Sequence, residues 1–353
     1  MATATPPVSA DPEEANTFLE GLSQFNVGPL WKVLGQVLTP EPRTRAVPHV
    51  WRWKELRPHL LRSGEVVTAA EAERRVLMLL NPALEGQVAT TTTLYGGLQL
   101  ILPGEVARTH RHTPNALRFI MEGEGAYTVV DGDKMTMAPG DFVLTPNWTW
   151  HDHGSEGSEP VVWLDGLDIP LASLLENIFT EPFSEEAQPV TKALNSSVAG
   201  YGKGGLLPSW QRPTDDGNSA LLKYAWTDAH EMLMSLGKDD ASPFDGTILE
   251  YVNPVTGGPS LPTMDSFLQR LKPGQKTQAH RHSSSAVYLA VEGYGQTMIN
   301  DKVYEWAPGD VFALPLWARH WHENLSASED AILFSFTDTP VMKALHWYRE
   351  QEA

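Results

Sequence analysis

Residues 102–154 read LPGEVARTHRHTPNALRFIMEGEGAYTVVDGDKMTMAPGDFVLTPNWTWHDHG, and this stretch decides the fold. Residues 271–324 read LKPGQKTQAHRHSSSAVYLAVEGYGQTMINDKVYEWAPGDVFALPLWARHWHEN and match it motif by motif. The tripeptide HRH at 110–112 recurs at 280–282, and the later histidine pairs and Pro-Gly-Asp turns recur in the same order. Chance does not produce so many ordered matches at an almost constant offset. The sequence therefore predicts two homologous domains.

Each repeat has the pattern of an all-β domain. Apolar side chains recur along short segments such as 127–130 and 142–144. Turn signals separate these segments at 122–125, 131–133 and 139–141. Short strands joined by Gly, Pro and Asp turns are typical of a sandwich or a small barrel.

The rest of the chain is expected to be partly helical. Helix-like apolar patterns cover residues 11–38 and 51–61, and shorter ones cover 171–179 and 341–350. Residues 189–218 are rich in Gly, Pro and Ser, as in a connector. We therefore expect five segments in this order: an N-terminal arm with helices (1–73), the first β domain (74–170), a connector (171–240), the second β domain (241–340) and a C-terminal helix (341–353).

Composition excludes several classes of function. The chain has 353 residues and a formal charge of −18, from 26 basic and 44 acidic residues. This charge repels polyanions, so nucleic acid and anionic membrane are excluded as partners. The absence of cysteine excludes disulfides, thiolate nucleophiles and iron–sulfur clusters. Residues 1–15 lack the features of a signal peptide and no apolar run could span a bilayer, so we expect a soluble, cytoplasmic protein.

The histidine pairs point to a metal site. Residues i and i+2 of a strand face the same side, so His110 and His112 aim together, as do His151 and His153. If the two strands are neighbours, the imidazoles converge. Three neutral imidazoles bind a metal and leave positions open for substrate. The alternative, a chance H-x-H pair on a surface strand, does not account for its repetition with a later histidine.

These motifs resemble the cupin superfamily, whose signature combines H-x-H, a later Pro-Gly-Asp and a third histidine. The resemblance implies an all-β bicupin, with two tandem double-stranded β-helix (jelly-roll) barrels, an N-terminal helical arm and short connecting helices. Many cupins carry a glutamate ligand four residues after the second histidine. Here Ala116 and Ala286 stand at that position. The departure argues against the oxalate-metabolising manganese cupins.

A narrower resemblance is to gentisate 1,2-dioxygenases, a group that includes salicylate and 1-hydroxy-2-naphthoate dioxygenases. It rests on TLYGGLQ (93–99), HRHTPNALRFIMEGEGAYTVVDG (110–132), PGDFVLTPNWTWHDHG (139–154) and EPVVWLDGLDIPL (159–171). The similarity covers most of residues 74–170 and continues more weakly through the second repeat. It implies one Fe(II) per catalytic cupin, O2 as co-substrate, and a cytoplasmic homo-oligomer, usually a tetramer.

The resemblance also implies roles for residues of the first repeat. The metal ligands would be His110, His112 and His151. His153 would act as an acid, a base or a hydrogen-bond donor near the metal. Arg118 would anchor the substrate carboxylate or stabilise reduced oxygen, and Asp165 would orient His153 or the substrate hydroxyl. Read without the resemblance, Arg118 fits a surface position and Asp165 fits a turn before Gly166.

A substrate pocket is implied by the same family. Tyr95, Gly97 and Gln99 alternate on one face of a strand, and in the family this face lines the pocket; they also fit an ordinary barrel interior. Gly97 would leave room for the aromatic ring. Either Arg74 or Arg75 would supply a second anion contact, and the sequence does not choose between them.

The second repeat keeps three histidines, so a possible second metal site consists of His280, His282 and His320. It carries Tyr288 in place of Arg118, and its counterpart of Asp165 is Ser335. We therefore expect a catalytic first cupin and a structural or optional second metal site.

A substrate with a carboxylate beside a phenolate suits three neutral ligands because it brings the compensating negative charge. The expected reaction is extradiol-type cleavage of gentisate (2,5-dihydroxybenzoate) between the carboxyl- and hydroxyl-bearing carbons, which gives maleylpyruvate. Two alternatives remain. One is cleavage of salicylate, substituted salicylate or 1-hydroxy-2-naphthoate by the same mechanism. Tyr95, where salicylate-cleaving relatives can carry Trp, favours gentisate. The other alternative is a non-enzymatic bicupin binding protein.

Overall fold

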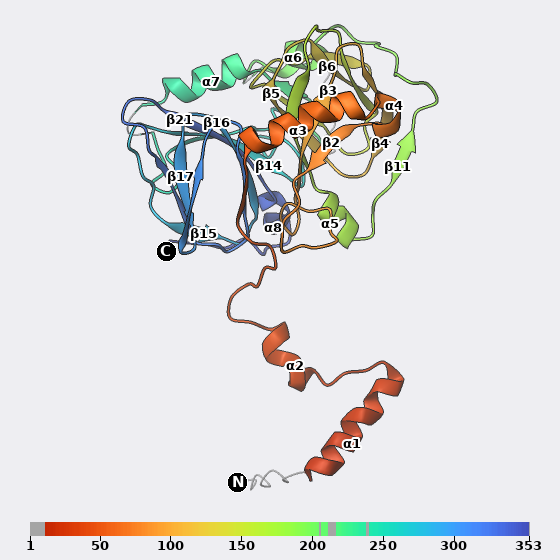
Figure 1. Cartoon of the computed structure of the whole chain (residues 1–353), viewed down its shortest axis with the longest axis vertical. Coiled ribbons are helices and arrows are strands. Elements are labelled where there is room, and N and C mark those ends of the chain that lie inside the picture. Colours follow the sequence, from red (N-terminus) through yellow and green to blue (C-terminus); the bar gives the residue numbers. More distant parts are fainter. Residues whose placement is uncertain (1–10, 205, 211–216, 238–239, 353) are drawn as a thin grey trace. The chain divides into compact units, whose positions relative to one another are not determined.

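The computed structural model describes residues 11–204, 206–210, 217–237 and 240–352 (Figure 1). The first ten residues of the expected arm, the final residue, and parts of the expected connector at 205, 211–216 and 238–239 therefore lie outside the described residues. The chain divides into two compact units, residues 1–43 and 44–353. Among the described residues, no helix combines the length and the apolar character needed to cross a bilayer.

The smaller unit is a helical segment with an interruption. Asp11 caps its first helix by accepting a hydrogen bond from the backbone N–H of Glu13 at 3.0 Å. A short 3-10 helix follows, and it ends at Asn26, whose backbone is in the left-handed conformation. The apolar pattern over residues 11–38 therefore forms separate helices instead of a single one. No residue in them is buried. The elements are α1 (Pro12–Leu22), η1 (Ser23–Phe25) and α2 (Leu30–Val37).

The described residues of the larger unit form four antiparallel sheets, two in each repeat. The six-stranded sheet of the first repeat has the order β12 (Lys223–Tyr224), β8 (Phe142–Thr145), β5 (Ala116–Glu122), β10 (Val161–Leu167), β3 (Tyr95–Ile101), β2 (Arg75–Met78). Its five-stranded sheet has the order β11 (Thr180–Pro182), β4 (Val106–His112), β9 (His151–Ser155), β6 (Ala126–Val130), β7 (Asp133–Thr136). The expected all-β organisation of the repeat is confirmed.

The second repeat has the same plan. Its six-stranded sheet has the order β1 (His49–Trp51), β19 (Val311–Leu314), β16 (Ala286–Glu292), β21 (Ala331–Thr337), β14 (Asp265–Leu271), β13 (Thr247–Glu250). Its five-stranded sheet has the order β18 (Lys302–Trp306), β17 (Gly295–Ile299), β20 (His320–Asn324), β15 (His280–His282), β22 (Glu350–Glu352). The helices of this unit are α3 (Trp53–Val66), α4 (Ala69–Ala72), α5 (Ile169–Leu174), α6 (Ser196–Tyr201), α7 (Trp226–Ser235) and α8 (Thr339–Ala344).

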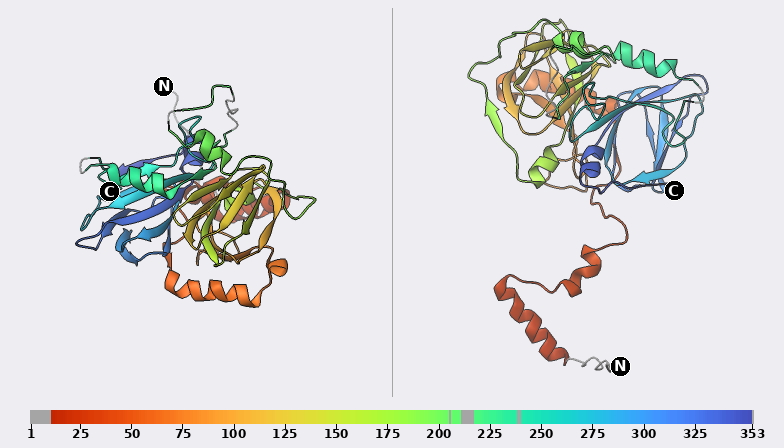
Figure 2. Two further views of the ribbon diagram at one scale, coloured as in Figure 1. Left: turned by 90° about the horizontal axis from the view of Figure 1, so that it is seen from above. Right: turned by 180° about the vertical axis from the view of Figure 1, so that it is seen from behind.

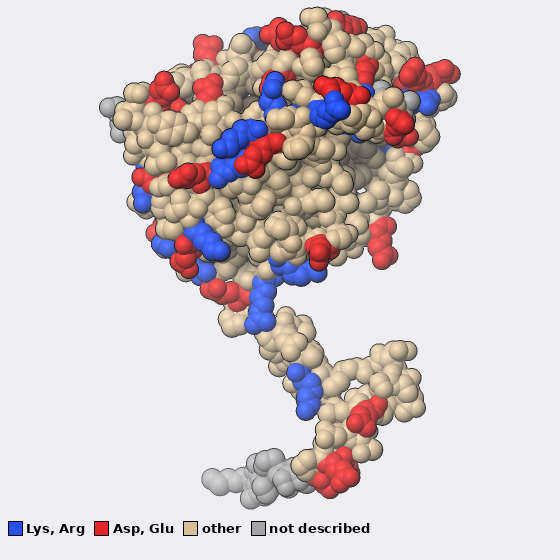
Figure 3. Space-filling view, viewed as in Figure 1, with Lys and Arg blue, Asp and Glu red and all other residues tan. Residues whose placement is uncertain are grey.

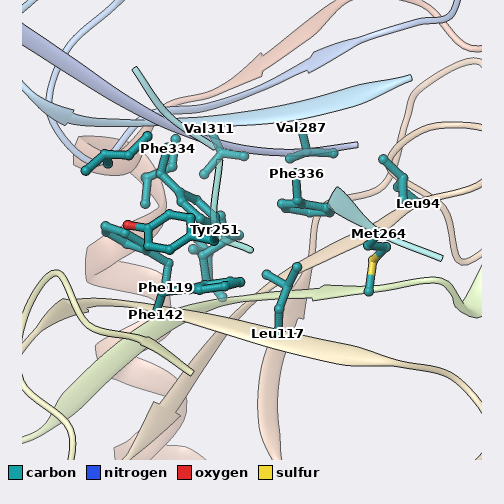
Figure 4. Packing of buried hydrophobic residues seen from close by; sticks show 14 of the residues in the cluster. Leu94, Leu117, Phe119, Phe142, Tyr251, Met264, Val287, Val311, Phe334 and Phe336 are labelled. Atoms are coloured by element: carbon teal, nitrogen blue, oxygen red, sulfur yellow. The ribbon is translucent and has the colours of Figure 1, made fainter. Parts of the chain in front are cut away.

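The two repeats share one hydrophobic core. Alternate residues of the six-stranded sheets face each other across it, and Figure 4 shows these side chains interleaving. Phe119 stacks on Phe334 with ring centroids 4.4 Å apart, and Phe142 lies 4.6 Å from Tyr251. Because the outward faces of both sheets are buried in this way, the opposite faces remain to line the interior of each repeat.

Two short strands are exchanged between the repeats. Strand β1 lies before the first repeat in sequence but pairs with β19 of the second, and β12 lies before the second repeat but pairs with β8 of the first. Helices α3 and α7 follow these exchanged strands, and Figure 2 shows α3 running along the outside of the paired barrels. Asp310 accepts a hydrogen bond from the Trp53 backbone N–H at 2.8 Å, and Asp141 accepts one from that of Trp226 at 3.0 Å.

The expected boundaries of two segments need correction. The C-terminal helix was expected over residues 341–353, but α8 spans only Thr339–Ala344. His346 then takes a left-handed conformation (φ 59°), and the chain turns back to pair β22 with β15. The expected connector (171–240) also provides β11 and β12 to the sheets of the first repeat. In both places a sheet edge takes up a short segment whose own pattern does not indicate a strand.

Candidate metal centre

The histidines of the first repeat converge at the middle of its five-stranded sheet. Strands β4 and β9 are neighbours, and an irregularity between Ala107 and His110 places His110 directly opposite His151. Ring centroids are 5.2 Å apart for His110 and His112, 4.3 Å for His110 and His151, and 4.8 Å for His112 and His151. One candidate ligand nitrogen from each ring lies within 4.8 Å of the others. The structure thus brings together the three predicted ligands.

Hydrogen bonds orient two of these rings for metal binding. The Nδ1 atom of His112 donates to the carbonyl of Pro114 at 2.7 Å, and Nδ1 of His151 donates to that of Thr149 at 2.9 Å. A carbonyl can only accept, so Nδ1 carries the hydrogen and Nε2 keeps its lone pair. The Nε2 atom of His151 is buried without a hydrogen-bond partner among the described residues. Such an atom fits a metal ligand.

The protonation state of the rings also suits a metal. Burial lowers the pKa of His112 to about 4. Burial, and the charge of Arg74 beside it, lower the pKa of His110 to about 3. Burial holds the pKa of His151 well below its usual value. All three imidazoles are therefore neutral near pH 7, which is the form that binds metal.

The structure decides between the two neighbouring arginines. Arg75 is buried and its guanidinium pairs with Glu105 at 2.5 and 2.6 Å, so it supports the strand. Arg74 faces the metal centre, with Nη2 2.5 Å from Nδ1 of His110 and 3.1 Å from the carbonyl of Arg108. A guanidinium can only donate, so this contact needs a lone pair on Nδ1 of His110 and a hydrogen on Nε2. The Arg108 carbonyl, 3.3 Å from the same Nδ1, offers an acceptor for the other tautomer, in which the Nε2 lone pair faces a metal. Of the two arginines, Arg74 is therefore the one that lies beside the candidate ligands.

Arg118 and Asp165 lie on the six-stranded sheet that forms the other side of the interior. They are directly paired on β5 and β10, with 3.3 Å between Nε and Oδ1. Nη1 of Arg118 donates to the Thr145 hydroxyl at 2.9 Å, and the indole N–H of Trp163 donates to Asp165 at 3.0 Å. Burial raises the pKa of Asp165 to about 6, although Arg118 acts to lower it. Thr145 and Trp163 lie inside the matched motifs, but the motifs alone gave them no role.

His153 is oriented by a different residue from the one expected. It lies on β9 beyond His151, and its Nδ1 is 2.8 Å from the hydroxyl of Thr128 on β6. Asp165, expected to orient either His153 or the substrate hydroxyl, contacts Arg118 and Trp163 on the opposite sheet. The Nε2 atom of His153 is buried with no hydrogen-bond partner among the described residues. Burial and the charge of Arg118 lower its pKa well below the usual value, so the ring is neutral.

Tyr95, Gly97 and Gln99 share one face of β3, as the sequence predicted, and Gly97 pairs directly with Asp165. A Cβ atom on Gly97 would lie 2.5 Å from the Tyr95 hydroxyl and 2.6 Å from Cγ1 of Val76. The space above Gly97 is therefore occupied by the Tyr95 hydroxyl. Burial and the nearby Asp165 raise the pKa of Tyr95, which keeps the phenol protonated. Gln99 is 2% exposed.

The second repeat repeats the triad without the cationic residues. One candidate ligand nitrogen from each of His280, His282 and His320 lies within 4.8 Å of the others. Ser335 pairs with Tyr288 in the same way that Asp165 pairs with Arg118. The strand register thus agrees with the expected replacement of Arg118 by Tyr288 and of Asp165 by Ser335.

Comparison with known proteins agrees with this geometry. The family model described as "Cupin domain" matches residues 97–167 and 267–337. The chain is 41% identical to gentisate 1,2 dioxygenase 1 of Aquipseudomonas alcaligenes, over 96% of each chain. It is 38% identical to 5-aminosalicylate 1,2-dioxygenase of Comamonas sp, over 94% of this chain and 88% of the relative.

A solved structure is also similar. Salicylate 1,2-dioxygenase from Pseudoaminobacter salicylatoxidans, crystallised as adducts with gentisate, has a TM-score of 0.89 and 32% identity, covering 100% of this chain and 97% of that one. A storage or binding role without catalysis finds no support among these relatives. The chain belongs to the gentisate 1,2-dioxygenase family of bicupin ring-cleaving oxidoreductases, and its two repeats are cupin domains.

Proposed function

We propose that this enzyme binds Fe(II) in its first cupin and cleaves gentisate with O2 to give maleylpyruvate. The observation that carries the proposal is the arrangement of a neutral three-histidine centre beside two buried or half-buried arginines, Arg74 and Arg118, in a protein of charge −18. An aromatic acid that approaches such a protein needs local cations to reverse the average field. A dianionic chelate also compensates the +2 charge that three neutral ligands leave on the metal.

The metal, when bound by His110, His112 and His151, would activate O2 and receive the substrate carboxylate and phenolate. The chain's own residues would do the rest. Arg118 would hold the carboxylate through its planar fork, with Arg74 as a second cation. Thr145 and Asp165 would fix the plane of the Arg118 guanidinium. The buried Nε2 of His153 would exchange a proton or a hydrogen bond with the reacting group. Both oxygen atoms of O2 enter the product, so no external reductant is needed.

Salicylate, substituted salicylates and 1-hydroxy-2-naphthoate are the alternative substrates. They would use the same centre, so selectivity depends on the residues around the ring, and Tyr95 is the one that favours gentisate. The test is an O2-uptake panel over these acids and gentisate, using protein loaded with Fe(II) without air. We expect the highest kcat/KM with gentisate, with absorbance of the product confirming ring opening. Uptake with a salicylate and none with gentisate would replace the proposed substrate.

We further propose a homo-oligomer, with a tetramer as the expected form. The support is the smaller unit, in which large apolar side chains are exposed: Phe25 is 68% exposed, Trp31 65% and Leu38 71%. Exposed apolar side chains gathered in this way mark a surface that contacts other protein. The mass in solution of the full chain, compared with a variant that lacks residues 1–43, tests this. A full-length monomer would overturn it.

A further inference from the structure

A threonine of the second cupin is hydrogen-bonded to the loop that follows the histidine strand of the first. Thr263 lies just before β14, and its hydroxyl donates to Oδ2 of Asp168 at 2.5 Å. Asp168 comes directly after β10 of the first cupin and is 5% exposed. The Thr263 hydroxyl also accepts a hydrogen bond from the side-chain amide of Asn115 at 2.9 Å. One member of this buried polar cluster therefore comes from the other cupin.

Asp168 binds the peptide group that orients His112. Its Oδ1 accepts a hydrogen bond from the backbone N–H of Asn115 at 2.8 Å. That N–H and the carbonyl of Pro114 belong to one planar peptide group, so they turn together. The Pro114 carbonyl accepts the hydrogen on Nδ1 of His112 at 2.7 Å. The Thr263 hydroxyl is therefore connected to the His112 ring through Asp168 and a single peptide plane.

The backbone of His112 is held from the same loop. Oδ1 of Asn115 accepts a hydrogen bond from the backbone N–H of Asn147 at 2.9 Å. The next backbone N–H, that of Trp148, donates to the carbonyl of His112 at 2.9 Å. Both the ring and the carbonyl of His112 are thus attached to groups that bond to Asn115 or to its peptide group. A rotation of this peptide group would change the direction in which Nε2 of His112 points.

The same contact occurs in reverse at the other barrel. Thr93 lies just before β3 of the first cupin, and its hydroxyl donates to Asp338, which follows β21 of the second. Asp338 accepts a hydrogen bond from the backbone N–H of Ser285 at 2.7 Å. The carbonyl of that peptide group accepts the hydrogen on Nδ1 of His282 at 2.9 Å. Ser285 stands where the first cupin has Asn115, and its hydroxyl has no partner among the described residues.

The symmetry of the two contacts points to a common role. Thr93 and Thr263 stand 170 positions apart in the chain, as do Asp168 and Asp338. The helices that follow the two aspartates, α5 and α8, lie at the same end of the barrels (Figure 1). In each barrel the aspartate receives a hydroxyl from the other barrel and fixes the peptide group behind one histidine. The contact is more extensive in the first cupin, because the side chain of Asn115 takes part.

We propose that Thr263 is a positioning residue for the metal centre of the first cupin, and that it acts on His112 through Asp168 and the peptide group of residues 114 and 115. The inference rests on the proposed function only in taking His112 as a metal ligand. Three hydrogen bonds in series link the hydroxyl to the ring. Loss of the hydroxyl should therefore tilt the ring and weaken the centre, while the ligand itself remains.

The test compares Thr263→Val, which removes the hydroxyl but keeps the shape, with Thr263→Ser, which keeps the hydroxyl. Both are made in a His280→Ala chain, so that a single complete histidine triad remains. Metal-free protein is titrated with Co(II) without air, and binding is measured by equilibrium dialysis and by the visible absorption of the ion.

We expect Thr263→Val to bind Co(II) about 10-fold more weakly and with a shifted absorption spectrum, because loss of a partner behind a metal-binding histidine costs about 10- to 100-fold in affinity. Thr263→Ser should match the parent chain. Unchanged affinity and spectrum in Thr263→Val would overturn the proposal. An equal loss in Thr263→Ser would do the same, because the hydroxyl would then not be the cause.

Thr93→Val is the matched control, because it removes the equivalent hydrogen bond between the cupins. Urea unfolding should show a similar fall in stability in the two valine variants, since each loses one hydrogen bond to a carboxylate. Only Thr263→Val should change the Co(II) spectrum of the first centre. If Thr93→Val changes that spectrum as much, the two contacts only hold the cupins together and the positioning role fails.

A double-mutant cycle tests the route through Asp168. Asp168→Asn keeps the shape of the side chain, but its amide nitrogen cannot accept a hydrogen bond from the Thr263 hydroxyl. If both residues act on the same peptide group, adding Thr263→Val to Asp168→Asn should cause no further loss of Co(II) affinity. Losses that multiply in the double variant would mean two independent effects and would exclude this route.

Activity separates this inference from the proposed function. In an otherwise wild-type chain loaded with Fe(II), Thr263→Val should lower kcat for gentisate by up to about 10²-fold, and Thr263→Ser should restore it. If no form cleaves gentisate but the Co(II) results hold, the proposed substrate fails and the positioning role stands. If gentisate is cleaved equally by wild type and Thr263→Val, with equal Co(II) binding, the positioning role fails and the substrate stands.

Discussion

Arg118 and Asp165 pair across neighbouring strands inside the first cupin, where they are only 4% and 3% exposed. The 3.3 Å between Nε and Oδ1 leaves the guanidinium bound on one edge, and Thr145 holds another. Two buried opposite charges depend on each other, because either one alone would be an uncompensated charge away from water. The pairing therefore fixes the orientation of the Arg118 guanidinium and acts on the pKa of Asp165.

Replacing Arg118 should separate catalysis from metal binding. We expect Arg118→Ala to lose roughly 10²-fold in kcat/KM, or about 3 kcal/mol of transition-state stabilisation, and Arg118→Lys to keep part of the activity. The iron content should not change, because Arg118 is not a ligand. Steady-state O2 uptake and metal analysis on the same samples measure both. Full activity in the alanine variant would place Arg118 outside the site, and lost iron would make its role structural.

Asp165 should give the enzyme an acid limit. Burial raises its pKa to about 6, so the carboxylate is ionised above that pH and protonated below it. Only the ionised form pairs with Arg118, and kcat/KM should therefore fall as the pH drops below about 6. In Asp165→Asn this fall in kcat/KM at acid pH should disappear, and kcat/KM should be lower than wild type at every pH. O2 uptake measured from pH 5 to 8 compares the two profiles, and an unchanged acid limb in the variant would assign it to another group.

The activity of the enzyme should be sensitive to a single carbon added at Gly97. In Gly97→Ala the new Cβ would meet the Tyr95 hydroxyl and the Val76 side chain at 2.5 and 2.6 Å, so Tyr95 must move. A shift of this kind near a bound ring can reduce kcat/KM by up to about 10²-fold, and we expect unchanged metal content. Gly200→Ala on α6, where an added Cβ meets nothing within 4 Å, is the control and should behave as wild type. Equal activity of the two variants would show that the position of Tyr95 does not matter.

The shared core should make the two cupins unfold together. Phe334 is fully buried and stacks on Phe119 of the other cupin. We expect Phe334→Ala to lower the free energy of unfolding by about 3–5 kcal/mol. Urea unfolding followed by tryptophan fluorescence and by release of bound Co(II) should show coincident transitions. Leu174→Ala, at a side chain 71% exposed, is the control with little change. Two separated transitions in the wild-type protein would contradict a common core.

The features that the sequence could predict are those with local periodicity. Placement of His110 beside His112, and of Tyr95 beside Gly97 and Gln99, depends only on the two-residue repeat of a strand. The convergence of the histidine pairs followed from their repetition, and the strand register bears it out. The replacement of Arg118 by Tyr288 was visible because both lie at the same place in matched motifs.

What escaped prediction depends on partners distant in the chain. Arg74 and Arg75 look equivalent in sequence, and only the position of Glu105 assigns Arg75 to an ion pair. Thr128 orients His153 from 25 residues away, so no motif joins them. The C-terminal strand β22 has three polar residues and no strand pattern, yet the edge of β15 gives its backbone hydrogen-bond partners.

The exchange of β1 has a consequence for synthesis of the protein. Arg52 follows β1 directly and bonds to Asp310, a residue 258 positions further along the chain. At roughly 5–20 residues per second, the ribosome needs about 13–50 s to make that partner after Arg52 itself is made. Strand β1 therefore leaves the ribosome well before β19, the strand with which it pairs, has been made. Final closure of the second cupin has to be a late event, after nearly the whole chain has been translated.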